Sequence, residues 1–172
     1  LISDEAYRQI VFPGARFTSP TAFYANSFLV YTLGKVLLTP GQRIGYIALP
    51  PTMPDRETMR NALFVTQASM GWAFPNAVLQ YALPELLRLS IDLDALRTRI
   101  ERMASALTDM GYEVIAPEGT FYMNIVSPWE DDTAFSRLLM EKKVYCLPGT
   151  VMQMSGYLRL SMTANSAMVE RS

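Results

Sequence analysis

The chain has 172 residues, of which 50% are hydrophobic and 18% are charged, so it is long and apolar enough to build a folded core. Fifteen basic and sixteen acidic residues give a net charge of −1, and no block of Lys or Arg occurs. We therefore expect no nucleic-acid partner and no membrane partner. The absence of His and the single Cys exclude a Ser–His triad, a His-ligated metal and an internal disulfide.

The first elements expected along the chain are strands. Leu1 and Ile2 are interpreted as the end of a buried strand that runs directly into polar residues. The segments FLVYTL (28–33) and IGYIAL (44–49) are short, β-branched or aromatic, and bounded by Gly, Pro or Asn. This pattern is typical of buried strands in a mixed or parallel sheet.

Residues 54–110 have a helical pattern. Asp55 is expected to cap a helix that starts near Arg56. Apolar residues recur at helical spacing over 77–110, and Pro84 with the step at 90–92 predicts a kink or a junction between two helices. Beyond residue 110 we expect a helix from Asp131 or Asp132 and four strands, at 112–117, 121–126, 144–147 and 157–162.

These elements predict an α/β fold in three parts. Residues 1–76 form part of a large mixed-sheet domain, 77–110 a helical connector, and 111–172 a small α+β domain. The sequence starts without Met and inside an apparent strand, so we expect it to be a piece of a longer protein.

Lys35 is the first candidate for chemistry, because it directly follows an apolar strand, where α/β sheets place ligand groups. Arg43 follows eight residues later, before the next strand. A second cation nearby favours a neutral, nucleophilic lysine amine that attacks carbonyl groups. The alternative is a solvated lysine at a strand end and an ordinary surface arginine.

Asp4 and Tyr7 form the second candidate pair. They lie three residues apart, or roughly 10 Å in an extended chain, which suits a flat heteroaromatic ring held at a nitrogen and a hydroxyl. A buried carboxylate would keep the nitrogen protonated, and a phenol would bond to the hydroxyl. The alternative is that Asp4 and Glu5 start a helix and that Tyr7 belongs to the core.

Five segments then carry a resemblance to a family: SDEAY, TLGK, GQRIGY, GTFYMNI and PGT…GYLRLS. In this order they resemble the C-terminal half of class I/II aminotransferases that depend on pyridoxal 5′-phosphate and have the aspartate aminotransferase fold, known as fold type I. The resemblance extends from Asp4 to about Ala164.

The resemblance implies a role for each matching residue. Lys35 is similar to the lysine that forms a Schiff base with the cofactor and moves the proton at the substrate α-carbon. Asp4 is similar to the partner of the ring nitrogen, Tyr7 to the phenol that bonds the ring hydroxyl, and Thr32 and Arg43 to the phosphate contacts. Arg159 is similar to the arginine that binds the substrate α-carboxylate, its alternative being a rim arginine on an edge strand.

Gly34 departs from the Ser or Ala that many members have before the lysine, which favours a looser backbone or one phosphate contact fewer. The family's first half normally supplies a glycine-rich phosphate loop, a stacking aromatic residue and an asparagine. These 172 residues alone are therefore expected to be inactive.

The resemblance implies a cytoplasmic homodimer that transfers an amino group between an α-amino acid, either aspartate or an aromatic one, and a 2-oxo acid. Two alternatives stay open. One is a lyase, decarboxylase or synthase that uses the same residues, and the other is a non-catalytic effector domain of a regulator.

Overall fold

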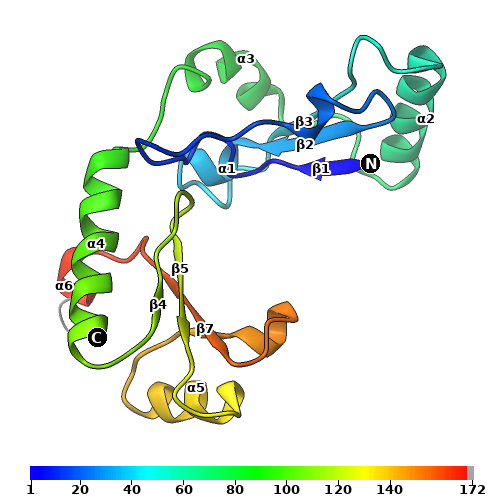
Figure 1. Ribbon diagram of the computed structural model, residues 1–172. Helices are drawn as coiled ribbons and strands as arrows, with labels where there is room; N and C mark the ends of the chain where they lie inside the picture. The colour runs from blue at the N-terminus through cyan, green and yellow to red at the C-terminus, as the bar shows by residue number, and fades with distance from the viewer. Residues whose placement is uncertain (170–172) are drawn as a thin grey trace. The chain divides into compact units, whose positions relative to one another are not determined.

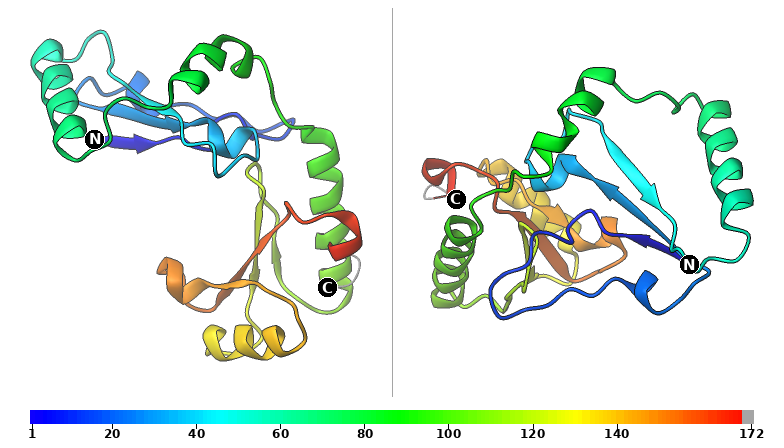
Figure 2. Two further views of the ribbon diagram at one scale, coloured as in Figure 1. Left: turned by 180° about the vertical axis from the view of Figure 1, so that it is seen from behind. Right: turned by 90° about the horizontal axis from the view of Figure 1, so that it is seen from above.

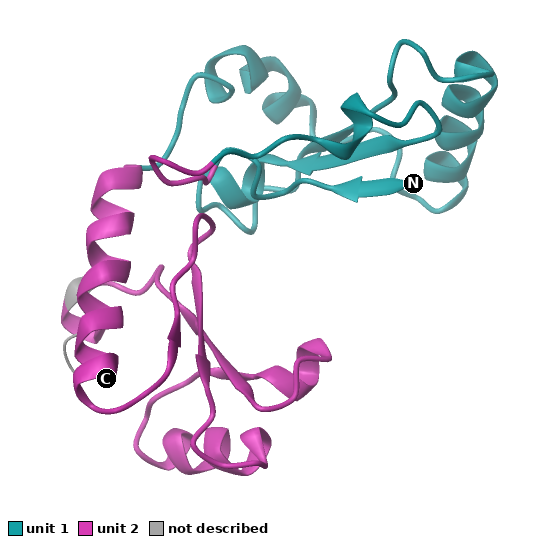
Figure 3. Ribbon diagram, viewed as in Figure 1, with its two compact units in different colours: residues 1–9, 16–91 teal, residues 10–15, 92–172 magenta. Residues whose placement is uncertain are grey.

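The computed structural model describes residues 1–169 and divides them into two compact units (Figure 3). Unit 1 contains residues 1–9 and 16–91, and unit 2 contains residues 10–15 together with the chain from Asp92 onward. The division at 91/92 differs from the boundaries expected at 76/77 and 110/111, and the roles assigned to those domains stay predictions. The expected end of the last domain, at residue 172, lies outside the described residues.

Unit 1 is built on a three-stranded sheet of order β1-β2-β3 (Figure 1). The strands are β1 (Ile2–Asp4), β2 (Phe28–Thr32) and β3 (Gly45–Ala48). The β1 and β2 strands are parallel, whereas β2 and β3 are antiparallel. The expected mixed sheet is therefore confirmed, with strands one or two residues shorter than the apolar runs. Both views in Figure 2 show the three strands, coloured from dark blue to cyan, lying side by side.

The core of unit 1 lies around the central strand. Leu29 and Tyr31 of β2 are buried, as are Leu33 and Val36 in the short helix α1 (Leu33–Val36) that follows. The expectation of a buried first strand is wrong, because Leu1 and Ile2 are 59% and 66% exposed. Within the described residues β1 pairs only with β2, and the side chains of Leu1 and Ile2 remain uncovered.

Three further helices belong to unit 1: η1 (Pro20–Ala22), α2 (Arg56–Ser69) and α3 (Ala77–Leu86). Asp55 stands at the N-cap of α2 but makes no side-chain cap hydrogen bond, which corrects the expected capping role. The physical reason is its left-handed backbone, with φ near 50° rather than the extended conformation that aims a cap side chain at the first turn. The expected interruption of 77–110 is confirmed, since α4 (Leu93–Asp109) starts a separate helix in unit 2.

Unit 2 contains a four-stranded antiparallel sheet of order β4-β5-β7-β6. Its strands are β4 (Val114–Ile115), β5 (Tyr122–Val126), β6 (Leu147–Pro148) and β7 (Tyr157–Ser161). The remaining helices are α5 (Asp132–Glu141), η2 (Gly149–Met152) and α6 (Ser166–Val169). The strand expected at 144–147 is wrong for its first three residues, because only Leu147 of that segment joins β6.

The core of unit 2 joins its sheet to its helices. Ile125 of β5, Phe135 of α5 and Leu158 of β7 form a buried cluster, and Leu107 of α4 packs against it. Both α4 and α5 therefore cover the sheet with an apolar face, as their helical spacing predicts.

Residues 10–15 belong to unit 2, although residues on both sides of them in sequence belong to unit 1. The Phe12 N–H donates to the Glu118 carbonyl at 2.9 Å, and the Thr120 N–H donates to the Ile10 carbonyl at 2.7 Å. Gly119 is needed here, because a Cβ at this position would lie 2.4 Å from the Ile10 carbonyl oxygen.

Within residues 1–169, no helix combines the length and the apolar character that crossing a membrane requires.

Candidate functional site

The candidate site residues of unit 1 gather at one end of its sheet, beyond the carboxyl ends of β1 and β2. This boundary of the sheet is called its carboxyl edge. The parallel strands β1 and β2 end at Asp4 and Thr32, at the same edge. Because β3 runs in the opposite direction, its first residue, Gly45, pairs with Thr32 at that edge. Lys35 follows Thr32 and Arg43 precedes Gly45, so the sheet brings both to this edge. Ligands of open α/β sheets bind beyond such carboxyl ends.

Lys35 and Tyr7 face each other at this edge. Lys35 lies in α1 and is half-buried, and its Nζ stands 5.6 Å from the centroid of the Tyr7 ring. An ammonium within about 6 Å of an aromatic face is attracted by the electron-rich ring. Residues 6–9 form turns, so the alternative of a helix starting at Asp4 is wrong, and so is the extended 10 Å spacing. These turns bring Tyr7 to Lys35.

Thr32, Gly34 and Arg43 form the second part of the cluster. The Thr32 hydroxyl accepts from the Gly34 N–H at 3.3 Å and donates to the Ile44 carbonyl at 3.3 Å. A Cβ on Gly34 would lie 3.5 Å from Arg43 Nη1 and 3.6 Å from Thr32 Oγ1, which places the guanidinium and the hydroxyl over the same glycine. Gly34 is buried, and its N–H is hydrogen-bonded to the Thr32 hydroxyl, while the looser backbone or missing phosphate contact expected there stays a prediction.

Arg43 is exposed at the same place, and its Nη1 donates to the Pro40 carbonyl at 3.2 Å. This bond uses one side of the guanidinium and fixes it against the 39–42 turn. A planar guanidinium beside a hydroxyl is a donor set that suits a phosphate group.

The Asp4 side chain is more exposed than the sequence predicts. Its Oδ1 accepts from the Ala6 N–H at 3.2 Å, but the side chain is exposed rather than buried. Like Ile2, Asp4 lies on β1, whose side chains at these two positions are not covered within the described unit. Asp4 therefore lies at the expected end of β1 without the expected burial.

Glu5 is a carboxylate beside the site that the sequence reasoning did not select. It is 2% exposed, its Oε2 lies 3.2 Å from Arg8 Nη1, and its Oε1 accepts from the Ser19 hydroxyl. The only signal in the sequence is its position in SDEAY, between Asp4 and Tyr7. Its contacts anchor the turn that carries Tyr7.

Tyr31 is buried on the central strand near this turn. Its hydroxyl donates to Gln9 Oε1 at 2.5 Å, and its ring lies 5.2 Å from that of Tyr46. Burial and, to a smaller extent, the Tyr46 phenol raise the pKa of Tyr31, while Arg8 lowers it. Tyr31 therefore stays a neutral hydrogen-bond donor at ordinary pH.

Arg159, the sixth candidate, belongs to unit 2. It lies on β7 between Asn124 of β5 and Leu147 of β6, so the alternative of an edge-strand arginine is wrong. Its Cζ stands 4.3 Å from the centroid of the Tyr122 ring, which orients the guanidinium plane. Tyr122 was not selected from the sequence, although it lies within GTFYMNI.

The donor set of unit 1 fits pyridoxal 5′-phosphate. An amine beside a phenol suits a ring that carries an aldehyde and a hydroxyl, and Thr32 with Arg43 suits a phosphate. The Asp4 carboxylate suits a ring nitrogen. Within residues 1–169, no group of three His, Cys, Asp or Glu side chains is arranged to hold a metal ion.

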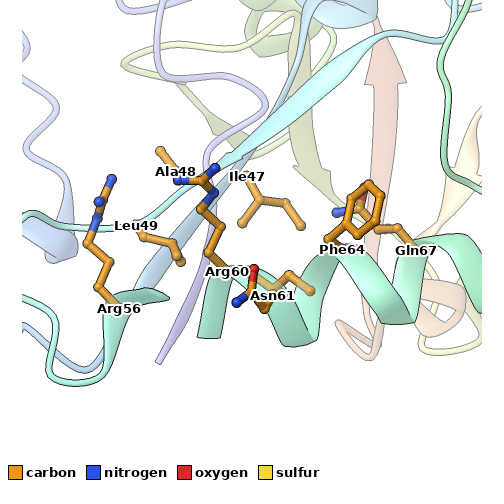
Figure 4. Close-up of a pocket in the computed structure, with 9 residues that line it drawn as sticks. Ile47, Ala48, Leu49, Arg56, Arg60, Asn61, Phe64 and Gln67 are labelled. Carbon is orange, nitrogen blue, oxygen red and sulfur yellow. The ribbon is translucent and has the colours of Figure 1, made fainter. Parts of the chain in front are cut away.

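A separate open pocket of about 650 Å³ lies between β3 and α2 in unit 1 (Figure 4). None of the candidate site residues lines it. The lining residues are Ile47, Ala48, Leu49, Arg56, Arg60, Asn61, Leu63, Phe64 and Gln67.

A mixed α/β fold with a lysine, a phenol, a hydroxyl and an arginine beyond the carboxyl ends of parallel strands is an arrangement typical of cofactor-binding α/β proteins. Comparison with known proteins identifies the family: residues 1–171 match Aminotransferase class I and II, and the chain belongs to this family. Members of the family depend on pyridoxal 5′-phosphate.

Individual proteins with low sequence identity to the chain are also aminotransferases. The chain is 28% identical to a tyrosine aminotransferase of Caenorhabditis elegans, over 99% of the chain and 39% of the relative. It is 28% identical to a probable aspartate/prephenate aminotransferase of Thermus aquaticus, over 94% of the chain and 43% of the relative. The chain thus spans about two-fifths of the length of these relatives.

Solved structures confirm the expected fold. An aminotransferase from Eubacterium rectale superimposes with a TM-score of 0.92 at 27% identity, over 99% of this chain and 43% of that one. An aspartate aminotransferase from Thermotoga maritima gives a TM-score of 0.80 at 26% identity, over 99% and 44%.

Proposed function

We propose that the protein carrying this chain is an aminotransferase that moves an amino group between an α-amino acid and a 2-oxo acid. The observation that carries the proposal is the convergence of Lys35 and Tyr7 with Thr32 and Arg43 at one sheet edge, in a chain of the aminotransferase family. When bound, pyridoxal 5′-phosphate supplies an electron sink that stabilises negative charge at the substrate α-carbon.

Each candidate site residue has a defined role in this proposal. Lys35 Nζ would hold the cofactor covalently and would move the proton at the substrate α-carbon. The Tyr7 hydroxyl and the Asp4 carboxylate orient the ring. Thr32 and Arg43 bind the phosphate. Arg159 binds the substrate α-carboxylate, and Tyr122 keeps its guanidinium in a fixed plane.

The relatives support a narrower substrate class. Their names include tyrosine, aspartate and aspartate/prephenate aminotransferases. We therefore propose aspartate or an aromatic amino acid as the donor. We also propose a homodimer in the cytoplasm.

Covalent labelling tests the proposal directly, because the chain has three lysines, Lys35, Lys142 and Lys143. Borohydride reduction in the presence of pyridoxal 5′-phosphate should place the label on the peptide that contains Lys35. The Lys35→Ala variant should lose the label and the turnover of the intact protein, whereas Lys142→Ala should keep both. Label confined to Lys142 or Lys143 contradicts the assignment.

A half-reaction separates amino transfer from the other chemistry that the same residues serve. A stoichiometric amount of amino acid should convert the cofactor of the intact protein to its pyridoxamine form, with release of the 2-oxo acid. A lyase or a decarboxylase does not leave the amino group on the cofactor.

A further inference from the structure

Asp132, in the first turn of α5, is a buried carboxylate that the proposed function does not use. Its side chain is 1% exposed, whereas its neighbour Asp131 is exposed and caps α5 by accepting from the Ala134 N–H at 2.9 Å. A charged group costs free energy when it is buried, unless hydrogen bonds replace its water. The role of Asp132 therefore follows from the groups it binds.

Four hydrogen bonds converge on the Asp132 carboxylate. Oδ2 accepts from the Thr150 N–H at 3.0 Å, from the Thr150 hydroxyl at 3.0 Å and from the Gly156 N–H at 2.9 Å, and Oδ1 accepts from the Thr133 hydroxyl at 3.2 Å. Burial acts to raise the pKa of Asp132, but these bonds outweigh burial and lower it. Asp132 therefore stays ionised and joins both ends of the 150–156 segment through one oxygen.

That segment is tightly folded. The Met154 N–H donates to the Gly149 carbonyl at 2.9 Å, and a Cβ on Gly149 would lie 1.9 Å from the Met154 carbonyl oxygen. Gln153 and Gly156 have left-handed backbones, with φ of 59° and 85°. Such a loop needs bonds that hold it closed, and within the described residues the Asp132 carboxylate supplies three of them.

The segment leads directly into the strand that carries Arg159. Pairing of β7 with β5 starts at Tyr157, opposite Val126, and the Gly156 carbonyl accepts from the Ser127 N–H at 2.8 Å. Arg159 comes three residues after Gly156. The position of Gly156 therefore fixes where β7 begins, and with it the placement of Arg159 over Tyr122.

We infer that Asp132 is a positioning residue for Arg159: its carboxylate closes the 150–156 loop and thereby holds the start of β7 in place. One part of the inference, that Arg159 binds the substrate carboxylate, rests on the proposed function. Bidentate binding of a carboxylate requires a guanidinium in a fixed orientation. A loosened loop weakens the binding of both substrates, because both carry the same carboxylate.

The loop itself is tested first, by hydrogen exchange of the intact protein. Asp132→Ala removes the acceptor of three donors in the loop, so the amides from Thr150 to Arg159 should exchange faster. Asp132→Asn should restore much of the protection, because its carbonyl oxygen can take the place of Oδ2. Asp131→Ala is the matched control, since it removes the cap of the same helix and leaves the loop bonds intact.

The role in binding is tested by kinetics of the intact protein. For Asp132→Ala we expect KM for the amino acid and for the 2-oxo acid to rise on the order of tenfold or more, with a much smaller change in kcat. Asp132→Asn should recover most of the loss, and Asp131→Ala should leave KM unchanged. Thr150→Val, which removes only one hydroxyl donor, should give a smaller rise in KM. This variant tests the inference if Asp132→Ala does not fold.

The outcomes separate the two proposals. Unchanged KM in Asp132→Ala and Thr150→Val overturns the inference, as does an equal rise in Asp131→Ala. Loss of active protein at constant KM shows a merely structural role and overturns it as well. Absence of the half-reaction in the unsubstituted protein overturns the proposed function, and with it the substrate part of the inference, whatever the exchange data show.

Discussion

Helices α2 and α5 have similar amphipathic patterns and opposite surroundings. In unit 2, α5 buries Asp132, Phe135 and Ser136, and Phe135 joins a core cluster. In unit 1, α2 is longer, yet none of its side chains is buried, and Phe64 is 59% exposed. An amphipathic pattern therefore predicts that the apolar face of a helix packs against another element. The pattern does not identify that element.

The same contrast holds for the two units as wholes. Unit 2 covers its sheet with α4 and α5, whereas the exposed large apolar residues of α2 and α3 include Phe64, Val65, Val78 and Tyr81. The free energy of unfolding of unit 2 should therefore depend on its own core, and that of unit 1 should respond little to changes on α2 and α3.

The largest expected effect comes from a matched pair of phenylalanines in these helices. Phe135→Ala should destabilise unit 2 by about 3–5 kcal/mol, because it removes a buried ring from a packed cluster. Phe64→Ala should change the stability of unit 1 by less than about 0.5 kcal/mol, because the ring is mostly exposed. Hydrogen exchange of peptides from each unit, measured across urea concentrations, gives both values. Equal losses in the two variants would remove the distinction between the helices.

A pair of glycines gives the next largest effect. Gly149→Ala should cost about 1–3 kcal/mol, because the added Cβ meets the Met154 carbonyl oxygen at 1.9 Å and the backbone must shift. Gly41→Ala in unit 1 has open space around it and should be neutral or stabilising by up to about 1 kcal/mol. Thermal unfolding of the two variants checks the sign of each change. A Gly149→Ala variant as stable as the parent would contradict the tight fold of the loop.

Alanine substitutions of two aspartates at helix starts should show the smallest difference in the free energy of unfolding. Asp92 caps α4 by accepting from the Ala95 N–H at 2.9 Å, so Asp92→Ala should cost about 1 kcal/mol. Asp55 makes no such bond, and Asp55→Ala should stay within about 0.5 kcal/mol of the parent. Denaturant titrations followed by circular dichroism measure both changes. A larger loss at Asp55 would show that its charge, rather than a cap bond, supports α2.

Much of the fold follows from local patterns. The strands at 28–33 and 44–49, the break between α3 and α4, and the start of α5 were predicted from apolar runs, Pro and capping residues. The prediction of a strand over 144–147 was wrong because β6 depends on its pairing with β7. Alternation of apolar residues alone does not reveal a partner strand. The exposure of Leu1 and Ile2 was missed for the same reason, since burial depends on what lies outside the segment.

For the candidate site, the residues were predictable and their geometry was not. The order of motifs selected Lys35, Tyr7 and Arg43, but no local pattern shows that the turn at 6–9 brings Tyr7 to Lys35 or that Arg43 and Thr32 meet over Gly34. Asp132 was interpreted only as a favourable helix start, because one sequence does not reveal that its bonds reach Thr150 and Gly156.

The assignment of residues 10–15 to unit 2 determines how the protein can be dissected. The polypeptide passes between the units three times, after Gln9, after Ala15 and after Ile91. A truncation that starts at Asp92 discards Ile10 and Phe12, which are 1% and 6% exposed, and leaves the Thr120 N–H without its acceptor. An autonomous unit 2 therefore requires a permuted gene in which codons 10–15 are fused to the remainder of the unit.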